Sequence, residues 1–369
     1  MQNKILILFL SLVLILTSCT NSVNEEIKLG VVAPLSGPNA WIGEFVIPSV
    51  QLAVDDINSK GGKQIKLIIE DADTSAKATT SANKLISQDG VNLIYSVTTP
   101  VTAAASAVAE QNKVPLFGFT AVQTFAKKNT WVFSDLRDVI QECSLLSQTA
   151  LKESDMKLAY LGNDADFSVE CLETLQKEFV AKGGELVISE VKNSGDHDAR
   201  TALIKIKETN PDALVLMCWP PDCNLIYRQM VELNFMPQLY LPVGVPLGAN
   251  AASVKDLDKN KILKDAFAGD QGIDMEDRTP EIKTFYDRLN AKIGKDIPYP
   301  DAVIAYDNIF EIAQALDKCS SELTNECLRD KLSQVDYTGA SGHIKFEGKH
   351  YAVRSAKVVK FVDSKWVDY

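Results

Sequence analysis

The chain has 369 residues and a formal net charge of −11, and 46% of its residues are hydrophobic against 24% charged. This composition is that of a globular protein. The acidic balance argues against a nucleic-acid partner, because binding to nucleic acid relies on Lys and Arg side chains that neutralise phosphates.

Residues 1–19 predict export and attachment to a membrane. Lys4 and the apolar run 5–16 fit a secretory signal peptide, and the run is too short to cross a bilayer as a stable helix. Leu16-Thr17-Ser18-Cys19 resembles a prokaryotic lipobox, in which the thiol of the cysteine is acylated. The alternative is an ordinary signal or anchor with an incidental cysteine. We therefore expect an extracytoplasmic protein anchored to the cell membrane by lipid on Cys19, with 20–26 as a polar tether.

Removal of the signal leaves 350 residues (369 − 19), more than one hydrophobic core usually serves, which favours two domains. From residue 27 onward, apolar strand-like runs alternate with helical patterns. This alternation indicates βαβ units in an α/β fold, with a mostly parallel sheet and helices on both faces. The expected strands of the first set cover 27–34, 65–69, 91–96 and 114–119, and its expected helices cover 45–57, 76–88 and 101–111.

A second set of similar size begins near residue 140. Its expected strands cover 157–161, 185–191, 213–217 and 238–242, and its expected helices cover 140–153, 168–182, 199–208 and 224–233. The remaining chain predicts a strand over 266–270, helices over 280–293, 301–317 and 324–334, and a strand pair over 342–347 and 351–363. We expect this part to return to the first lobe and then to the second. The expected N-terminal lobe is therefore 27–139 plus 267–340, and the expected C-terminal lobe is 140–266 plus 341–369.

Seven cysteines minus Cys19 leave six, an even number in an oxidising compartment. Fifteen connectivities are possible. The best local pair is Cys319–Cys327, and Cys218–Cys223 with Cys143–Cys171 would complete the set. A zinc site is disfavoured, because the sequence has no C-x-x-C and none of its three histidines lies near a cysteine. We expect no metal and no cofactor.

The sequence gives little support to catalysis. It contains no G-x-S-x-G, H-E-x-x-H, Walker A or G-x-G-x-x-G pattern. Asp71 and Asp73 form a D-x-D after a strand, but the downstream residues do not form an EF-hand, so we expect the pair to cap a loop. We expect the protein not to be an enzyme.

The most suggestive stretch is Ser96-Val97-Thr98-Thr99-Pro100, at the carboxyl end of an expected strand, where open α/β sheets bind ligands. Thr99 is a candidate helix N-cap, and Pro100 suits the first helical position. Unpaired backbone N–H groups and the helix dipole then favour an anionic group such as a carboxylate, and Thr98 and Thr99 add hydroxyls. The alternative is a plain N-cap with no ligand.

The sequence resembles the type 1 periplasmic solute-binding proteins, and among them the leucine/isoleucine/valine-binding-like receptors of ABC importers. The resemblance starts in 36–43 (SGPNAWIG) and 51–58 (QLAVDDIN), followed by Gly61-Gly62. It continues through 70–73 (EDAD), Val114-Pro115 and 211–213 (PDA), and it covers essentially the whole mature chain. The resemblance implies two Rossmann-like lobes with parallel central sheets, joined by three hinge crossings, with the ligand held in the cleft between them.

The resemblance also implies ligand-contact positions. Thr99 falls where the family places a Ser or Thr that binds the ligand carboxylate. The other implied positions are Ala121 (a backbone contact), Phe167 and Trp219 (cleft aromatics), and Trp41 or Ile42 (the near wall). For Phe167 and Trp219 the alternative is core packing.

Two positions depart from the pattern of the family. Val122 stands where amino-acid binders usually have a Thr, and Val243 stands where they often have an acid that pairs with the ligand ammonium. Because a buried ammonium without a counter-charge is costly, the ligand should be less polar at that end. An apolar or aromatic carboxylate or an amide would fit, unless Asp135, Asp164, Asp166 or Asp222 supplies the charge.

The leading hypothesis is a lipid-anchored receptor, expected to be monomeric, that captures a small organic solute and delivers it to an ABC permease. The second is a sensory or regulatory lipoprotein of the same fold, and the third is an extracytoplasmic hydrolase. A hydrolase would need a nucleophile and a base, and the three histidines have no evident Ser or Cys partner in the sequence.

Overall fold

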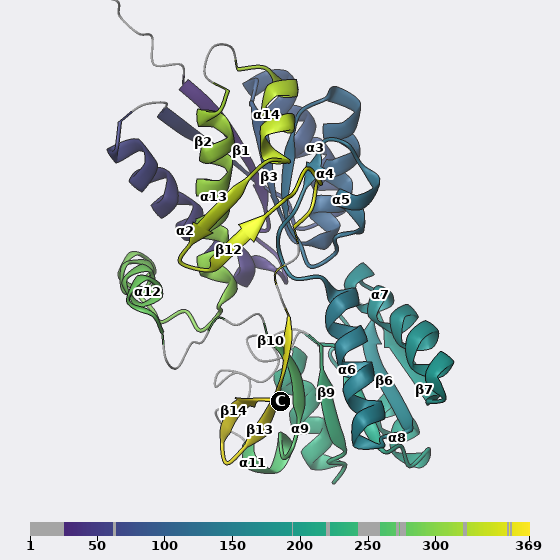
Figure 1. Ribbon diagram of the computed structural model, residues 1–369. Helices are drawn as coiled ribbons and strands as arrows, with labels where there is room; N and C mark the ends of the chain where they lie inside the picture. The colour runs from purple at the N-terminus through teal and green to yellow at the C-terminus, as the bar shows by residue number, and fades with distance from the viewer. Residues whose placement is uncertain are drawn as a thin grey trace, which may run out of the picture.

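The computed structural model describes residues 26–61, 64–193, 195–218, 222–242, 259–270, 273, 278–319, 323–352, 354 and 356–369. Cys19 with the signal and most of the tether, Trp219 and Val243 lie outside the described residues. Figure 1 shows two α/β lobes, one formed mostly by the first third of the chain and the other mostly by the middle.

The first lobe is built on a parallel sheet with strand order β2-β1-β3-β4-β5. Its strands are β1 (Glu26–Ala33), β2 (Gln64–Asp71), β3 (Leu93–Val97), β4 (Leu116–Phe119) and β5 (Val132–Phe133). The sheet has helices on both faces, so the central strands are apolar almost without interruption, as buried parallel strands must be.

The helices of the first lobe come from both ends of the chain. They are α2 (Ala40–Ser59), α3 (Ser75–Lys84, continued by a π-helical turn over Leu85–Asp89), α4 (Thr99–Asn112), α5 (Thr124–Lys128), α12 (Pro280–Ile293), α13 (Asp301–Asp317) and α14 (Asn325–Leu332). Side chains of α2, α12 and α13 form the core on one face of the sheet, and those of α3 and α4 form the core on the other. Helix α2 begins five residues before the predicted start, so Trp41 and Ile42 belong to its first turn.

The second lobe has a mixed sheet with strand order β14-β13-β10-β9-β8-β6-β7. Its strands are β6 (Lys157–Asn163), β7 (Glu185–Lys192), β8 (Ala213–Leu216), β9 (Gln238–Leu241), β10 (Phe267–Asp270), β13 (Lys357–Val362) and β14 (Lys365–Asp368). Its helices are α6 (Val139–Glu153), α7 (Asp166–Thr174, continued by a π-helical turn over Leu175–Phe179 and a 3-10 turn over Val180–Lys182), α8 (Arg200–Glu208), α9 (Asp222–Glu232) and α11 (Lys259–Ile262). All pairs are parallel except β10–β13 and β13–β14.

Two predicted lobe assignments differ from the structure. The strand 267–270 was assigned to the first lobe, but β10 pairs with β9 and β13 and is buried in the second. Residues 341–352 were assigned to the second lobe, but β12 (Gly342–Lys345) pairs with β11 (Asp336–Gly339), and Ile344, Phe346 and Ala352 are part of the core of the first lobe. The predicted strand pair 342–347 with 351–363 is therefore wrong, because its halves lie in different lobes.

The chain passes between the lobes three times. It leaves the first lobe between β5 and α6, returns between β10 and α12, and leaves again between Ala352 and β13 (Figure 1). The first and third crossings lie side by side: the Ser134 N–H donates to the His350 carbonyl (3.2 Å), and the Ala352 N–H donates to the Ser134 carbonyl (3.1 Å).

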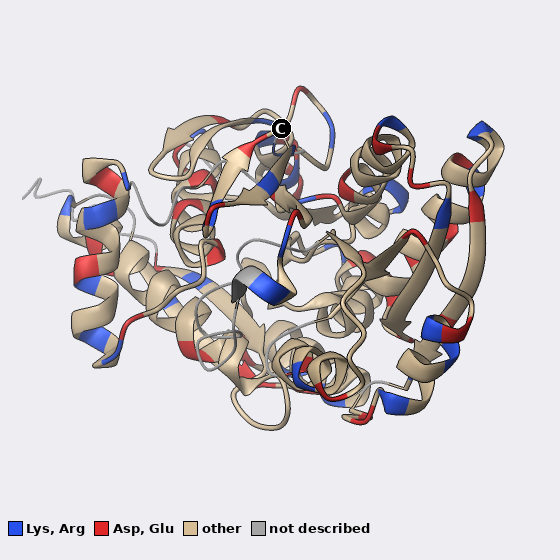
Figure 2. Ribbon diagram, turned by 90° about the horizontal axis from the view of Figure 1, so that it is seen from below, with Lys and Arg blue, Asp and Glu red and all other residues tan. Residues whose placement is uncertain are grey.

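All three predicted disulfides are present. Cys143–Cys171 joins α6 to α7, Cys218–Cys223 closes the turn between β8 and α9, and Cys319–Cys327 joins the end of α13 to α14. Basic and acidic residues are both distributed over the helices and loops of the two lobes (Figure 2).

Candidate functional site

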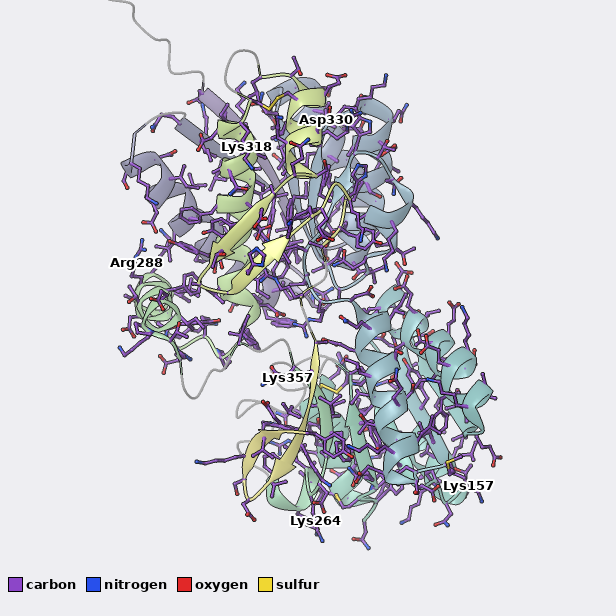
Figure 3. All side chains as sticks on the ribbon, in the orientation of Figure 1. Lys157, Lys264, Arg288, Lys318, Asp330 and Lys357 are labelled. Atoms are coloured by element: carbon purple, nitrogen blue, oxygen red, sulfur yellow. A yellow bond between two sulfur atoms is a disulfide. The ribbon has the colours of Figure 1, made fainter. Side chains whose placement is uncertain are left out.

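The carboxyl ends of the parallel strands in the two lobes face each other. Lys157, which opens β6, and Lys264, before β10, lie on the side of the second lobe away from the first (Figure 3). Lys357, paired with the last residue of β10, lies on the side that faces it (Figure 3). Because open α/β sheets bind ligands outside the carboxyl ends of their strands, the facing edges are the candidate site.

In the first lobe, the turn between β3 and α4 holds two threonines in a tight arrangement. Thr98, and not Thr99 as predicted, is the residue before the helix, and its side chain makes no capping hydrogen bond. Thr98 has φ 79°, a conformation that costs a β-branched residue strain energy and that is found preferentially at functional sites. Thr99 is buried, with its hydroxyl 3.0 Å from that of Thr120. The N-terminus of α4 thus carries a fixed pair of hydroxyls beside its first backbone N–H groups.

The segment after β4 connects this hydroxyl pair to the second lobe. The Val122 N–H donates to the Thr120 hydroxyl (3.2 Å), and the Val139 N–H, at the start of α6, donates to the Ala121 carbonyl (3.1 Å). The Val122 side chain is buried among residues of α6 and α7. The Ala121 carbonyl is therefore bonded to the protein itself.

Trp41 lies where the hydrophobic cores of the two lobes meet. Its ring is 5.1 Å from that of Tyr299 and 6.1 Å from that of Phe45, and both Trp41 and Tyr299 pack against core residues of both lobes. Ile42 packs against the core of the first lobe only. Of these two predicted wall residues, Trp41 is the one that reaches the second lobe.

On the second lobe, Phe167 lies in the first turn of α7 and is 6% exposed. It packs in the same core as Val122, so the structure brings these two predicted residues together. The neighbouring Glu170 accepts a 2.6 Å hydrogen bond from the hydroxyl of Thr124 in α5, which links the two lobes. The Cys218–Cys223 disulfide links the residues that follow β8 to the first turn of α9.

The D-x-D motif caps a loop, as predicted. Asp71 accepts hydrogen bonds from the Leu35 and Ser36 backbone N–H groups (2.8 and 3.2 Å) and from the Ser36 hydroxyl (2.6 Å), which lower its pKa. The carboxylate of Asp73 forms an ion pair with Lys77. These bonds hold the loop that leads into α2 and Trp41.

Sequence reasoning missed a set of buried charged side chains at the crossings. Arg137, in the first crossing, donates from Nη2 to both carboxylate oxygens of Asp301 at the start of α13, and both side chains are buried. Glu142, in the first turns of α6, is fully buried, and desolvation raises its pKa to about 8. The only sequence signal was the charged run 135–138 after a strand, which has the composition of a solvated loop.

A second buried cluster joins the first and third crossings. Arg354 donates to Asp135 (2.5 Å) and lies 3.5 Å from Glu311 of α13. Asn308, also on α13, donates to the other oxygen of Asp135 (2.7 Å). Burial and the neighbouring Asp135 raise the pKa of Glu311 well above its usual range.

Among the described residues, no group of three or more His, Cys, Asp or Glu side chains could hold a metal ion. The histidine rings bond to Asp222, Asp336 and the Asn129 carbonyl. Within the part of the chain that the structure describes, no helix is both long and apolar enough to span a membrane.

The family model described as "Periplasmic binding protein" matches residues 26–365, which include both lobes and all three crossings. The chain belongs to this family. It is a type 1 periplasmic binding protein of the Leu/Ile/Val-binding kind, and this family consists of solute-binding proteins. The Leu/Ile/Val-binding protein homolog 7 of Brucella abortus (strain 2308) is 24% identical over 330 residues, 85% of this chain and 82% of its own length.

Solved structures of periplasmic binding proteins share the two-lobed fold. The branched-chain amino acid transporter substrate-binding protein LivJ from Streptococcus pneumoniae, in complex with isoleucine, superposes with a TM-score of 0.77 at 23% identity, covering 93% of this chain and 98% of its own. A solute-binding protein from R. palustris in complex with benzoate superposes with a TM-score of 0.81 at 19% identity, covering 93% and 95%. The predicted fold class, with two lobes of parallel strands, is confirmed.

Proposed function

We propose that this periplasmic binding protein captures a small organic carboxylate between its lobes and delivers it to the permease of an ABC importer. The observation that supports this most directly is the buried Thr99–Thr120 hydroxyl pair at the N-terminus of α4, just after the carboxyl end of β3. Hydroxyls beside the first N–H groups of a helix suit a carboxylate, which gains from both the hydrogen bonds and the helix dipole.

The proposed ligand class is a branched-chain amino acid-like carboxylate, an amide, or an apolar or aromatic carboxylate. Relatives with the same fold bind isoleucine in one case and benzoate in another. The walls proposed for the site are Trp41, Ile42, Thr98, Pro100, Ala121, Val122 and Phe167, together with Trp219 and Val243 from outside the described residues. Aromatic and aliphatic walls of this kind suit an apolar ligand body, with few polar groups to fix its orientation.

Closure of the lobes follows from differential binding. A ligand that touches Thr99 in the first lobe and Phe167 in the second gains more contacts when the lobes are closed, so it shifts the population towards the closed state. The permease would then recognise that state. Lipid on Cys19 would keep the receptor at the membrane, since the tether 20–26 spans at most roughly 25 Å when fully extended.

The carboxylate site is tested by calorimetric titration of Thr99→Val, which removes the hydroxyl and keeps the shape of the side chain. The solute is first identified by mass spectrometry of small molecules released from the gently purified protein. Loss of a hydrogen bond to a charged group costs about 1.5–3 kcal/mol, so the affinity should fall roughly tenfold to a hundredfold. Thr79→Val is the matched control, because Thr79 is exposed on α3 and its hydroxyl donates to the Ser75 carbonyl within the same helix. An unchanged affinity in Thr99→Val would contradict the proposed site.

The anchor is tested separately with Cys19→Ala. We expect the variant to lose incorporation of radiolabelled fatty acid and to leave the membrane fraction, with ligand affinity unchanged, because the anchor and the lobes are independent parts. Retention of the variant on the membrane would contradict a lipid anchor. Loss of ligand binding would contradict the separation of anchor and receptor.

A further inference from the structure

Buried polar atoms without a partner gather where the two lobes and the crossings meet. In a folded protein such atoms are rare, and each one calls for an explanation, such as a functional role or a bound water or ion. Three of them lie on consecutive elements across the lobe junction: Gln123 Oε1 at the start of α5, Arg137 Nε in the first crossing, and Glu142 Oε2 in α6.

Gln123 is bonded to the first crossing, which carries Arg137 and leads directly into α6 and Glu142. Gln123 Nε2 donates to the carbonyls of Leu136 (2.6 Å) and Arg137 (3.4 Å), so its amide lies against the crossing. Arg137 is held by Asp301, and the charge of Arg137 acts directly on Glu142. Glu142 lies one turn after Val139, which donates to the Ala121 carbonyl beside the Thr99–Thr120 pair.

Glu142 lies on the edge of the second lobe that faces the first. A Cβ placed on Gly269 of β10 would lie 3.2 Å from Glu142 Cδ and 2.7 Å from the carbonyl oxygen of Pro242, which follows β9. Gly269 and Pro242 lie at the carboxyl ends of β10 and β9, and α/β proteins bind ligands at the carboxyl ends of parallel strands. Because Gly269 has no side chain, the carboxyl group of Glu142 fits against β10 at this position.

The charged side chains around Glu142 are already paired with one another. Arg137 is paired with Asp301, Asp138 with Lys127 (2.9 Å), and Asp270 with Lys357 (3.6 Å). These groups come from the crossing, α13, α5, β10 and β13, the elements packed around the carboxyl. A buried carboxyl with no cation of its own is stable as the neutral acid, which can donate one hydrogen bond and accept another.

We propose that Gln123, Arg137 and Glu142 form a polar subsite that hydrogen-bonds a neutral polar group, a hydroxyl or an amide, at the end of the ligand remote from its carboxylate. The subsite rests on the proposed function. A neutral group is favoured over an ammonium, because an ammonium would have to approach the Arg137 guanidinium and would require Glu142 to ionise beside Asp138, Asp270 and Asp301.

The test is isothermal titration of three probes at pH 6.5 and 8.5: benzoate, 4-(hydroxymethyl)benzoate and isoleucine. At pH 6.5 we expect the hydroxymethyl compound to bind about tenfold tighter than benzoate, the effect of one buried hydrogen bond. Since the neutral acid is the donor and its pKa is about 8, this advantage should shrink at pH 8.5.

Two variants separate the subsite from a structural role. Glutamine has the shape of the neutral acid and can also donate and accept hydrogen bonds. Glu142→Gln should therefore retain the preference for the hydroxymethyl probe, and this preference should no longer depend on pH. Glu142→Leu should remove the preference for the hydroxymethyl probe over benzoate. Asp155→Asn is the matched control, because Asp155 is a partly buried carboxyl bonded to Tyr240 at the opposite edge of the sheet, and it should change neither quantity.

Other outcomes overturn the subsite. These are equal affinity of the wild type for benzoate and the hydroxymethyl probe, a preference for isoleucine over both aromatic probes, or a crystal structure with the probe bound and only ordered waters at Glu142. Benzoate binding that is lost in Thr99→Val with no discrimination at Glu142 would leave the proposed function standing and refute the subsite. No binding of any probe would refute both.

Discussion

Replacement of Arg354 by Met should reveal how much the junction of the crossings contributes to stability. The Arg354 guanidinium is buried and faces the carboxyls of Asp135, Asp307 and Glu311. It also donates to the Ser341 hydroxyl (3.0 Å) and carbonyl (3.2 Å). Methionine keeps most of the alkyl volume and removes the charge and all of these hydrogen bonds.

The expected loss in the free energy of unfolding depends on the carboxyl groups that remain when Arg354 is replaced. Burial raises the pKa of Glu311 well above its usual range, which favours its neutral form, and Asp307 accepts hydrogen bonds from the N–H groups of Ala340 and Ser341 (3.3 and 2.6 Å). The uncompensated charge therefore falls on Asp135, which keeps one hydrogen bond from Asn308. Breaking a buried pair by removal of one partner costs about 3–5 kcal/mol, and we expect this loss in the free energy of unfolding.

Urea denaturation followed by circular dichroism at pH 7 measures this loss. Arg200→Met is the matched control: Arg200 pairs with Glu232 at 2.8 Å, but the side chains are 46% and 54% exposed, so its cost should stay below about 1 kcal/mol. In the double variant Arg354→Met/Asp135→Asn the buried charge is gone, and more than about 1 kcal/mol of the loss should be recovered. A cost for Arg354→Met equal to that of the surface control would refute the reasoning.

Two further predictions concern stability. Replacing Cys143 and Cys171 by Ser opens a link of 28 residues and should cost roughly 3–4 kcal/mol, against roughly 2–3 kcal/mol for Cys319 and Cys327, which are 8 apart; equal losses in thermal unfolding would contradict the chain-entropy explanation. Glu142 binds its proton more tightly in the folded state (pKa about 8, against 4.5), so the free energy of unfolding should fall by up to about 1.4 kcal/mol per pH unit from pH 4.5 to 8. Glu142→Gln should lack this contribution, and parallel pH profiles for the two proteins would show that the carboxyl titrates normally.

Much of the fold could be predicted from local sequence patterns. The alternation of apolar strands and amphipathic helices gave the α/β class. Among the cysteines, only Cys319–Cys327 had a local argument, and the other two pairs completed the set that the structure contains. The errors concern the assignment of strands to one lobe or the other. A short apolar strand such as β10 carries no signal for its partner, and only the pairing of Phe267 with Tyr240 and Lys360 shows which sheet it joins.

The polar part of the junction could not be predicted for a related reason. Asp135 and Arg354 are 219 residues apart, and Arg137 and Asp301 are 164 apart, so no spacing rule relates them. The threonine pair was accessible because Thr99 follows a strand and precedes Pro100 in a recognisable loop. Its partner Thr120 was not, since it follows a different strand that the parallel sheet brings alongside.

The pairing of the first and third crossings restricts how the lobes can move. Ser134 forms backbone hydrogen bonds with His350 and Ala352, and the Arg354 guanidinium donates to the Asp135 carboxylate. These bonds hold the third crossing to the first as far as residue 354. Swivelling one lobe about the long axis of the molecule would shear these buried bonds, at about 1–3 kcal/mol for each group left unpaired. Bending across the pair leaves them intact. The paired crossings therefore favour bending of one lobe towards the other over twisting of the lobes about the long axis.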